Sequence, residues 1–363
     1  HSNALGPYKG GLRFDESVTS SVLKFLAFEQ LFKNSLTGLN LGAGKGGSDF
    51  SPHGRSDVEV MRFCQAFMTE LARHIGQLVD VPAGDIGVGA REIGYLFGQY
   101  KRLENQFSGA VTGKMVGAGG SKMRNEATGY GAIYFLCCML ADDDLEIAGR
   151  RVAISGAGNV ALHAAEKAAA LDARVVTLSN RHGVLVKDDG LSPDDIEHIK
   201  NEYPGSNDLA AIAETIAARF VEGDKPWGQD CDVAIPSATQ NEVDEDDARM
   251  LADNGVKAVV EAANMPLTAN AAAVFAEAGV AIAPGKAANA GGVAVSGFEM
   301  SQNRLGRSWS AEKIDEELKA TMREIFRRTR DHGATGDGVD YARGADRAGF
   351  ERVARAVLSF GTM

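Results

Sequence analysis

The chain has 363 residues, 44% of them hydrophobic, and a formal net charge of −11 at pH 7. This length predicts two packed domains, and an acidic balance spread along the chain argues against a protein that binds nucleic acid or a membrane surface. Because the four cysteines have the spacing of neither a zinc site nor a disulfide framework, we expect free thiols, no metal and a cytoplasmic location.

The first third of the chain predicts an α/β layer whose special residues lie in glycine-rich loops. Apolar spacing and end signals predict three helices, over residues 18–36, 57–75 and 90–104. Ser56 and Glu59 have the spacing of a capping box at the start of the second helix. The first helix is expected to bury an apolar stripe formed by Val22, Phe25, Leu26 and Phe32.

Two lysines, Lys9 and Lys45, stand in glycine-rich segments. Glycine lets a ligand approach the backbone closely, and lysine adds a point charge whose pKa falls readily on burial. Between them, Gln30 and Lys33 are i, i+3 neighbours that project from one face of the first helix. A third glycine-rich segment contains Asp85. Together these segments predict a pocket for an anionic substrate, and the alternative is a pair of glycine turns with solvated lysines.

Near residue 149 the pattern changes to a strand, a glycine turn, an alanine-rich helix and a second strand that ends at Ser179. This order is typical of a dinucleotide-binding βαβ unit, in which glycines let the pyrophosphate approach the start of the helix. The glycines here are Gly156 and Gly158, with Ala161 in the third position. Later strands that alternate with helices predict a parallel, doubly wound sheet, and they are expected over residues 232–236, 258–261 and 280–283.

The end of the second strand indicates which dinucleotide is preferred. An NAD site usually has an acidic residue there, which accepts a hydrogen bond from the ribose 2′-hydroxyl. This chain has Ser179, Asn180 and Arg181, with no carboxylate among them. Since the Arg181 guanidinium could pair with a 2′-phosphate, NADP(H) is the expected cofactor, and NAD(H) is the less favoured alternative.

The C-terminal part predicts a long amphipathic helix over residues 310–331 and a last helix over 346–360. We expect residues 340–363 to return to a substrate-binding domain formed by residues 1–124. Residues 125–339 would form a Rossmann-like, doubly wound dinucleotide-binding domain. The predicted fold class is therefore α/β, with a mixed α/β layer in the substrate domain and a cleft between the two domains.

A lysine in a dry cleft beside a second cation loses pKa and can transfer protons near neutrality, and an aspartate close by can share that task. With a hydride carrier and an anionic substrate, this chemistry predicts an oxidoreductase that makes or breaks an imine. The chain resembles the hexameric bacterial glutamate dehydrogenases of the glutamate/leucine/phenylalanine/valine dehydrogenase superfamily. The resemblance extends over essentially all the chain and is carried by residues 6–14, 45–50, 82–89, 126–131, 238–242 and 284–293.

The resemblance implies a role for each matching position. Lys45 would be the catalytic lysine, and Asp85 would exchange protons with the substrate nitrogen. Lys9, helped by Ser296 from the second domain, would hold the side-chain carboxylate. The α-carboxylate end would be held by Lys33, with Gln30 and Gly84 nearby. The dinucleotide would be contacted by Thr128, Gly156, Gly158, Asn159, Val160, Ser179, Arg181, Ala238, Gln240 and Asn264.

The implied reaction is the reversible reductive amination of 2-oxoglutarate with ammonium and NADPH to L-glutamate. The resemblance also implies a homohexamer, and an N-terminal part of the family chain that is absent from this sequence. Lys9 and Ser296 stand where branched-chain and aromatic members of the superfamily look apolar, which favours a dicarboxylate. Two alternatives stay open: a dehydrogenase for another amino acid, and a dinucleotide-binding relative without enzymatic activity.

Overall fold

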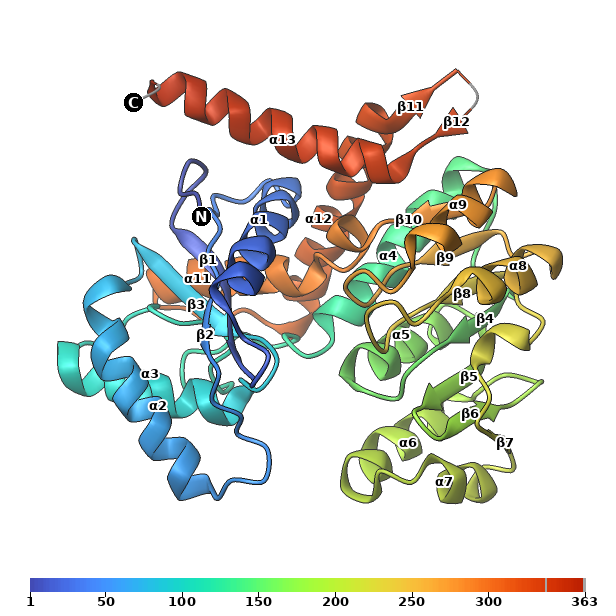
Figure 1. Ribbon diagram of the computed structural model, residues 1–363, viewed down its shortest axis with the longest axis horizontal. Coiled ribbons are helices and arrows are strands. Elements are labelled where there is room, and N and C mark those ends of the chain that lie inside the picture. The colour runs from blue at the N-terminus through green and yellow to red at the C-terminus, as the bar shows by residue number, and fades with distance from the viewer. Residues whose placement is uncertain (337, 362–363) are drawn as a thin grey trace. The chain divides into compact units, whose positions relative to one another are not determined.

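The computed structural model describes residues 1–336 and 338–361, and the chain divides into two compact units (Figure 1). The first unit consists of His1–Arg124, Val293–Thr321 and Asp346–Met363. The second unit consists of Asn125–Gly292 and Met322–Ala345. Residues 337, 362 and 363 lie outside the described ones. They belong to two segments expected from the sequence, 125–339 and 340–363.

After residue 290 the chain passes from one unit to the other three times, each time within a helix. These helices are α11 (Gly291–Leu305), α12 (Ala311–Gly333) and α13 (Tyr341–Phe360). The expected division placed residues 125–339 in one domain, but residues 293–321 cluster with the first unit. The reason is packing, because Met300 of α11 forms a buried cluster with Leu41 and Val81 of the first unit.

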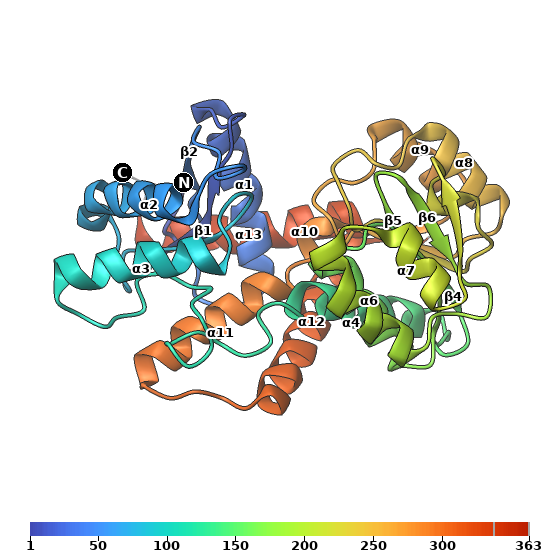
Figure 2. The same cartoon turned by 90° about the horizontal axis from the view of Figure 1, so that it is seen from below.

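The first unit is built on a three-stranded parallel sheet in the order β2-β1-β3. Its strands are β1 (Tyr8–Phe14), β2 (Gly46–Ser48) and β3 (Asp80–Gly84), and its first helices are α1 (Ser20–Leu36), α2 (Asp57–Leu71) and α3 (Ala90–Glu104). Ser56 and Glu59 form the expected capping box of α2. Helices α2 and α3 lie side by side in both views (Figures 1 and 2), and they share a core with Leu12 and Phe14 of β1.

The apolar stripe expected on α1 is wrong, since Phe25 is 47% exposed and Val22, Leu26 and Phe32 are only partly buried. The buried residues of α1 are Ala27, Leu31, Asn34, Ser35 and Leu36. The polar Asn34 decides this orientation, because its amide donates to the carbonyl oxygen of Lys9 at 3.0 Å and to that of Gly42 at 2.6 Å. Helix α13 contacts α1 as well, where Arg352 Nη1 donates to the Ser35 carbonyl at 2.6 Å.

The second unit contains a seven-stranded sheet in the order β10-β9-β8-β4-β5-β6-β7. The strands are β4 (Arg151–Ile154), β5 (Arg174–Asn180), β6 (Gly183–Val186), β7 (Arg219–Glu222), β8 (Val233–Ile235), β9 (Ala258–Val260) and β10 (Ala281–Ala283). Its main helices are α4 (Ala127–Asp142), α5 (Asn159–Ala169), α6 (Pro193–Ser206), α7 (Leu209–Thr215), α8 (Glu245–Asp253), α9 (Ala269–Glu277) and α10 (Gly285–Ala288). A short ribbon of β11 (Ala334–Thr335) and β12 (Gly338–Val339) follows α12.

The sheet is not wholly parallel, which corrects the sequence expectation. Strands β4, β5, β8, β9 and β10 run parallel, but β6 is antiparallel to β5 and β7 is antiparallel to β6. Asn180 pairs with Gly183, so only Arg181 and His182 connect β5 to β6. A two-residue connection of this kind joins antiparallel strands, since parallel strands need a long crossover.

Helices α4 and α5 pack closely because a glycine lies at their contact. A Cβ atom on Gly129 would come within 2.5 Å of the Ala164 nitrogen and within 2.7 Å of the Val160 carbonyl oxygen. Any other side chain would therefore push the two helices apart. The position of the α5 N-terminus, directly after the glycine turn, depends on this contact.

Candidate functional site

Lys45 and Asp85 form a close ion pair at the ends of two loops of the first unit. Lys45 directly precedes β2 and Asp85 directly follows β3, and the lysine Nζ lies 2.5 Å from the Asp85 Oδ2. Arg13 Nε lies 3.4 Å from the same oxygen. Burial raises the pKa of Asp85, but the Lys45 and Arg13 charges outweigh burial and hold that pKa below its usual range. The pair is thus an ammonium against a carboxylate, which is suited to proton exchange.

Glycine makes the approach of Asp85 possible. A Cβ atom on Gly11 would lie 2.7 Å from both the Asp85 Cβ and the Gly84 carbonyl oxygen. A Cβ atom on Gly84 would lie 2.3 Å from the Val88 carbonyl oxygen. Since such contacts are too short for real atoms, only glycine at these two positions leaves Asp85 beside β1.

Lys9 is buried in the middle of the first unit with only 2% of its surface exposed. Burial is the main cause that lowers its pKa from 10.5 to about 7, and the Arg124 charge adds to this effect. Glu299 and Asp80 raise the pKa again, while Lys45 lowers it further. A lysine with this pKa gains a proton readily when an anion binds beside it.

Ser296 lies in α11 and belongs to the first unit, together with Lys9. The expectation that it comes from the second domain is wrong, because residues 293–305 of α11 pack with the first unit. One helical turn further on, Glu299 is 0% exposed. Its Oε1 lies 2.7 Å from the Lys114 Nζ, and its Oε2 accepts from the Gly113 backbone N–H at 3.0 Å.

Three charged residues therefore lie around Lys9: Lys114 and Glu299, which are buried, and Arg124, which is half-buried. Together with Lys9 we call them the buried charge cluster. Lys114, Arg124 and Glu299 were not among the residues predicted from the sequence. The available signal was a glutamate within the apolar run of α11, at i+3 from Ser296. A carboxylate in that setting needs a buried cationic partner.

Gln30 and Lys33 occupy the second half of α1, and both are partly buried. The Gln30 amide donates to the Asn34 Oδ1 at 2.6 Å. Since Asn34 in turn donates to the Lys9 carbonyl oxygen, Gln30 is linked to β1 through a chain of hydrogen bonds. Lys33 lies in the last turn of the same helix.

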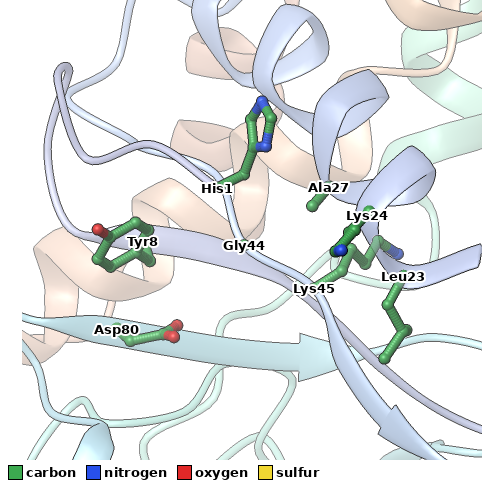
Figure 3. A pocket seen from close by; sticks show the side chains of 8 residues that line it. All are labelled: His1, Tyr8, Leu23, Lys24, Ala27, Gly44, Lys45 and Asp80. Atoms are coloured by element: carbon green, nitrogen blue, oxygen red, sulfur yellow. The ribbon is translucent and has the colours of Figure 1, made fainter. Parts of the chain in front are cut away.

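A pocket of about 350 Å³ adjoins Lys45 in the first unit (Figure 3). Figure 3 shows Lys24 of α1 and Lys45 on one side of this pocket, with Tyr8 and Asp80 on the other. Burial raises the pKa of Asp80, and the Lys9 charge partly offsets that rise. Lys24, Tyr8 and Asp80 were not predicted from the sequence to line this pocket.

The second unit has a pocket of about 380 Å³ at the start of α5. It brings together five of the expected dinucleotide contacts: Gly156, Gly158, Ser179, Arg181 and Ala238. Its other lining residues, which the sequence analysis missed, are Ala157, Asn180, His182, Tyr203, Asn207 and Ser237.

The turn before α5 fits a dinucleotide phosphate. Gly156 has φ +83°, a conformation that favours glycine, and its N–H donates to the Ser179 Oγ at 2.9 Å. Gly158 is the N-cap of α5, and a Cβ atom there would meet nothing within 4 Å, so its surroundings are open. The first N–H groups and the dipole of α5 favour an anion at this end, and the exposed Arg181 adds a positive charge to the pocket.

The remaining expected contacts lie elsewhere in the second unit. Thr128 is in the first turn of α4, and Asn159 begins α5, where its amide donates to the Asn125 carbonyl at 2.7 Å. Val160 follows it, and Gln240 is in the loop after β8. Asn264, in the loop after β9, accepts from the Asn289 amide at 3.2 Å.

The described part of the chain holds no group of three or more His, Cys, Asp or Glu side chains that could bind a metal ion. Among the same residues, every helix is too short or too polar to traverse a lipid bilayer. No disulfide joins the four cysteines, all of which lie among the described residues, and Cys64 and Cys231 are buried.

Two family models match the sequence. Residues 119–361 match glutamate/leucine/phenylalanine/valine dehydrogenase, and residues 1–102 match the dimerisation domain of Glu/Leu/Phe/Val dehydrogenase. A glutamate dehydrogenase of Bacteroides thetaiotaomicron is 54% identical over 99% of this chain and 82% of its own length. An NADP-specific glutamate dehydrogenase of Psychrobacter is 52% identical over 100% of this chain and 82% of its own.

The fold is similar to that of a crystal structure of Plasmodium falciparum glutamate dehydrogenase, with a TM-score of 0.97. That structure is 48% identical in sequence, and the match covers 99% of this chain and 78% of the other. The order of the elements that carry Lys9, Lys45 and Asp85 is therefore that of a known enzyme architecture.

Proposed function

The chain belongs to the glutamate/leucine/phenylalanine/valine dehydrogenase family and acts as a glutamate dehydrogenase, and we propose that its site residues divide the reductive amination of 2-oxoglutarate as follows. The substrates are 2-oxoglutarate, ammonium and NADPH, and the product is L-glutamate. The observation that carries the assignment is Lys9, a buried lysine whose pKa of about 7 suits it to pair with a second carboxylate.

Lys9 and Ser296 hold the distal carboxylate of the substrate. Lys33 holds the α-carboxylate, with Gln30 and the backbone at Gly84 beside it. A desolvated ammonium left without a partner is costly, so a substrate with an apolar side chain binds poorly to the same site. This division explains why a dicarboxylate is preferred to the 2-oxo acids of leucine or valine.

Lys45 and Asp85 carry the proton transfers. The Lys45 ammonium stabilises negative charge that develops on the keto oxygen when ammonia adds to the carbon. Asp85, held as a carboxylate by Lys45 and Arg13, accepts a proton from the substrate nitrogen and returns it in the reverse direction. The hydroxyl formed by this addition leaves as water, and NADPH, when bound, would supply the hydride to the resulting iminium carbon.

The cofactor is held by the second unit. The turn at Gly156 and Gly158 and the start of α5, with Asn159 and Val160, receive the pyrophosphate. Ser179 and Arg181 face the 2′-phosphate, which favours NADP(H) over NAD(H). The rest of the dinucleotide path is formed by Thr128, Ala238, Gln240 and Asn264.

The protein is further proposed to work as a cytoplasmic homohexamer with two functional domains. Residues 1–124, 293–321 and 346–363 would form the substrate domain, and residues 125–292 and 322–345 the cofactor domain. Family membership and the match to a dimerisation domain support an oligomer, and four cysteines without a disulfide fit a reducing compartment. Light scattering on the purified protein tests the subunit number, and a monomer or dimer would contradict the hexamer.

One assay tests reaction, substrate and cofactor together. Purified protein is mixed with ammonium and either 2-oxoglutarate or 4-methyl-2-oxopentanoate, each in parallel with NADPH and NADH. Oxidation of NADPH with 2-oxoglutarate as the faster substrate is expected. Faster turnover of the branched 2-oxo acid would favour another amino acid as product, and no cofactor oxidation in any mixture would favour an inactive dinucleotide-binding relative.

A further inference from the structure

Glu299 is a fully buried carboxylate that the reaction described above does not use. Its two oxygens are occupied by the Lys114 Nζ at 2.7 Å and by the Gly113 N–H at 3.0 Å. Lys114 also donates to the Val111 carbonyl oxygen, and its side chain is 2% exposed. Burying both members of an ion pair costs desolvation free energy that their attraction offsets only when the geometry is good.

The Glu299 carboxylate interacts electrostatically with all three cations of the buried charge cluster. Burial lowers the pKa of Lys9, of Lys114 and of Arg124, and Glu299 opposes the shift in every case. Without it, the two buried lysines and the half-buried Arg124 would lose their shared carboxylate, and the proton least tightly held would leave. Lys9 would lose its proton first, since its pKa is already about 7.

The position of Glu299 connects it to the substrate site. It follows Ser296 by three residues on α11, so the two side chains project from the same side of the helix. Asp80, the other acidic group that acts on Lys9, lies on β3 and is only partly buried. Because the solvent reaches Asp80 but not Glu299, the Glu299 charge is screened less.

We propose that Glu299 is a positioning residue for the distal carboxylate site: its buried carboxylate offsets the positive charges around Lys9 and thereby favours 2-oxo acids that carry a second carboxylate. This inference rests on the proposed function of Lys9. It assigns Glu299 a part in substrate choice although it acts through Lys9 and Lys114 rather than on the substrate. The competing explanation is purely structural, in which Glu299 only fastens the loop at residues 111–114 to α11.

The test uses Glu299→Gln in the full chain, with kcat and KM measured for 2-oxoglutarate and for 2-oxopentanoate, which lacks the distal carboxylate. At about pH 8 the KM for 2-oxoglutarate is expected to rise about tenfold, as it would if the pKa of Lys9 fell by about one unit. The kcat and KM for 2-oxopentanoate, and the KM for NADPH, are expected to stay the same. The alkaline fall in kcat/KM for 2-oxoglutarate should also begin at a lower pH.

The single change leaves Lys114 buried without its carboxylate, so a second variant removes both members of the pair. Lys114→Met with Glu299→Leu replaces the ion pair by apolar side chains of similar length, which proteins often tolerate. We expect the same selective rise in KM from this double variant. Glu92→Gln is the matched control, because Glu92 is a buried glutamate of α3 that accepts from the Gly89 N–H and from Arg91. It should lower stability without changing substrate preference.

The outcomes separate the inference from the function on which it rests. If the unmodified enzyme does not prefer 2-oxoglutarate, the proposed function of Lys9 fails. If it does, but the double variant keeps both the preference and the pH profile, Glu299 has no part in substrate choice. An equal loss with both 2-oxo acids in both variants would show a purely structural role and would also overturn the inference.

Discussion

The Nζ of Lys45 lies 2.5 Å from the Oδ2 of Asp85, although 40 residues separate the two in the chain. Each charge stabilises the other in a partly buried setting, since the two side chains are 10% and 15% exposed. Removal of Lys45 therefore takes away the charge that does most to hold the pKa of Asp85 below its usual range. We propose that the two residues act as one catalytic unit.

Substitution of this pair is expected to remove most of the activity without preventing cofactor binding. Lys45→Ala and Asp85→Asn should each lower kcat by about 10²–10⁴-fold, which is the usual contribution of a positioned acid or base. The double variant should be little worse than the poorer single variant, because groups that act together are not additive.

Steady-state kinetics and NADPH binding, followed by fluorescence, measure both effects. Lys225→Ala is the control, as Lys225 also lies 2.5 Å from a carboxylate, that of Asp247, but belongs to the second unit. Full additivity of the two losses would show that Lys45 and Asp85 act independently.

Lys9→Met is expected to abolish the preference for 2-oxoglutarate while it stabilises the fold near neutral pH. The folded-state pKa of Lys9, about 7, is below its unfolded value of 10.5. Between these values the unfolded chain binds more protons, so the stability of the parent protein rises with pH through that window. Lys9→Met has no ionisable group at this position, so its stability lacks this dependence on pH.

Thermal unfolding at about pH 6 and about pH 9 tests the Lys9 prediction. The melting temperature of Lys9→Met should exceed that of the parent at the lower pH, and the difference should shrink at the higher pH. A variant that is less stable than the parent at both values would show that the Lys9 ammonium is fully compensated in the fold.

Arg181→Gln should weaken NADPH selectively. A charge-assisted hydrogen bond to phosphate contributes about 1.5–3 kcal/mol, so the KM for NADPH should rise by about tenfold or more. The KM for NADH, which has no 2′-phosphate, should change little. Arg249→Ala provides the comparison, since Arg249 is an exposed arginine of α8 that pairs with Glu245. An equal effect on both cofactors would place Arg181 outside the 2′-phosphate site.

Gly129→Ala should disturb cofactor binding from a distance. The added Cβ would meet the backbone of α5 at 2.5 Å and 2.7 Å, and overpacking of this kind costs about 1–3 kcal/mol. We expect a lower melting temperature and weaker NADPH binding, because α5 carries the phosphate-binding turn. Gly98→Ala in α3, where a Cβ meets nothing within 4 Å, should instead stabilise the protein by up to about 1 kcal/mol. Unchanged NADPH binding in Gly129→Ala would show that α5 adjusts without cost.

The residues with a local signature could be found from the sequence, and those defined by distant contacts could not. Lys9, Lys45 and Asp85 stand in glycine-rich segments, and Gly156 and Gly158 lie between a strand and a helix, so short-range patterns reveal them. Glu299 and Lys114 are 185 residues apart. Only the packing of α11 on the first unit brings them together, and neither has a neighbour in sequence that indicates its partner.

Two predictions from the sequence, the apolar stripe on α1 and the wholly parallel sheet, were wrong for different reasons. The stripe on α1 was inferred from apolar spacing alone, but the hydrogen bonds of Asn34 turn the other side of the helix inward. The strands β6 and β7 were missed because helix–strand alternation was taken to continue. The apolar run after Gly183 follows β5 by two residues, which is the spacing of a hairpin.

That hairpin has a consequence for how such an enzyme can change. Arg181 and His182 form its whole tip, both are exposed, and the strands on either side are held by backbone hydrogen bonds that do not depend on side chains. Replacing these two residues alters the charge presented to the cofactor and leaves the sheet, the turn at Gly156 and the lysines of the first unit intact. With the proposed role of Arg181 at the 2′-phosphate, a change of cofactor needs substitutions at only two positions, and the residues proposed for proton transfer stay the same.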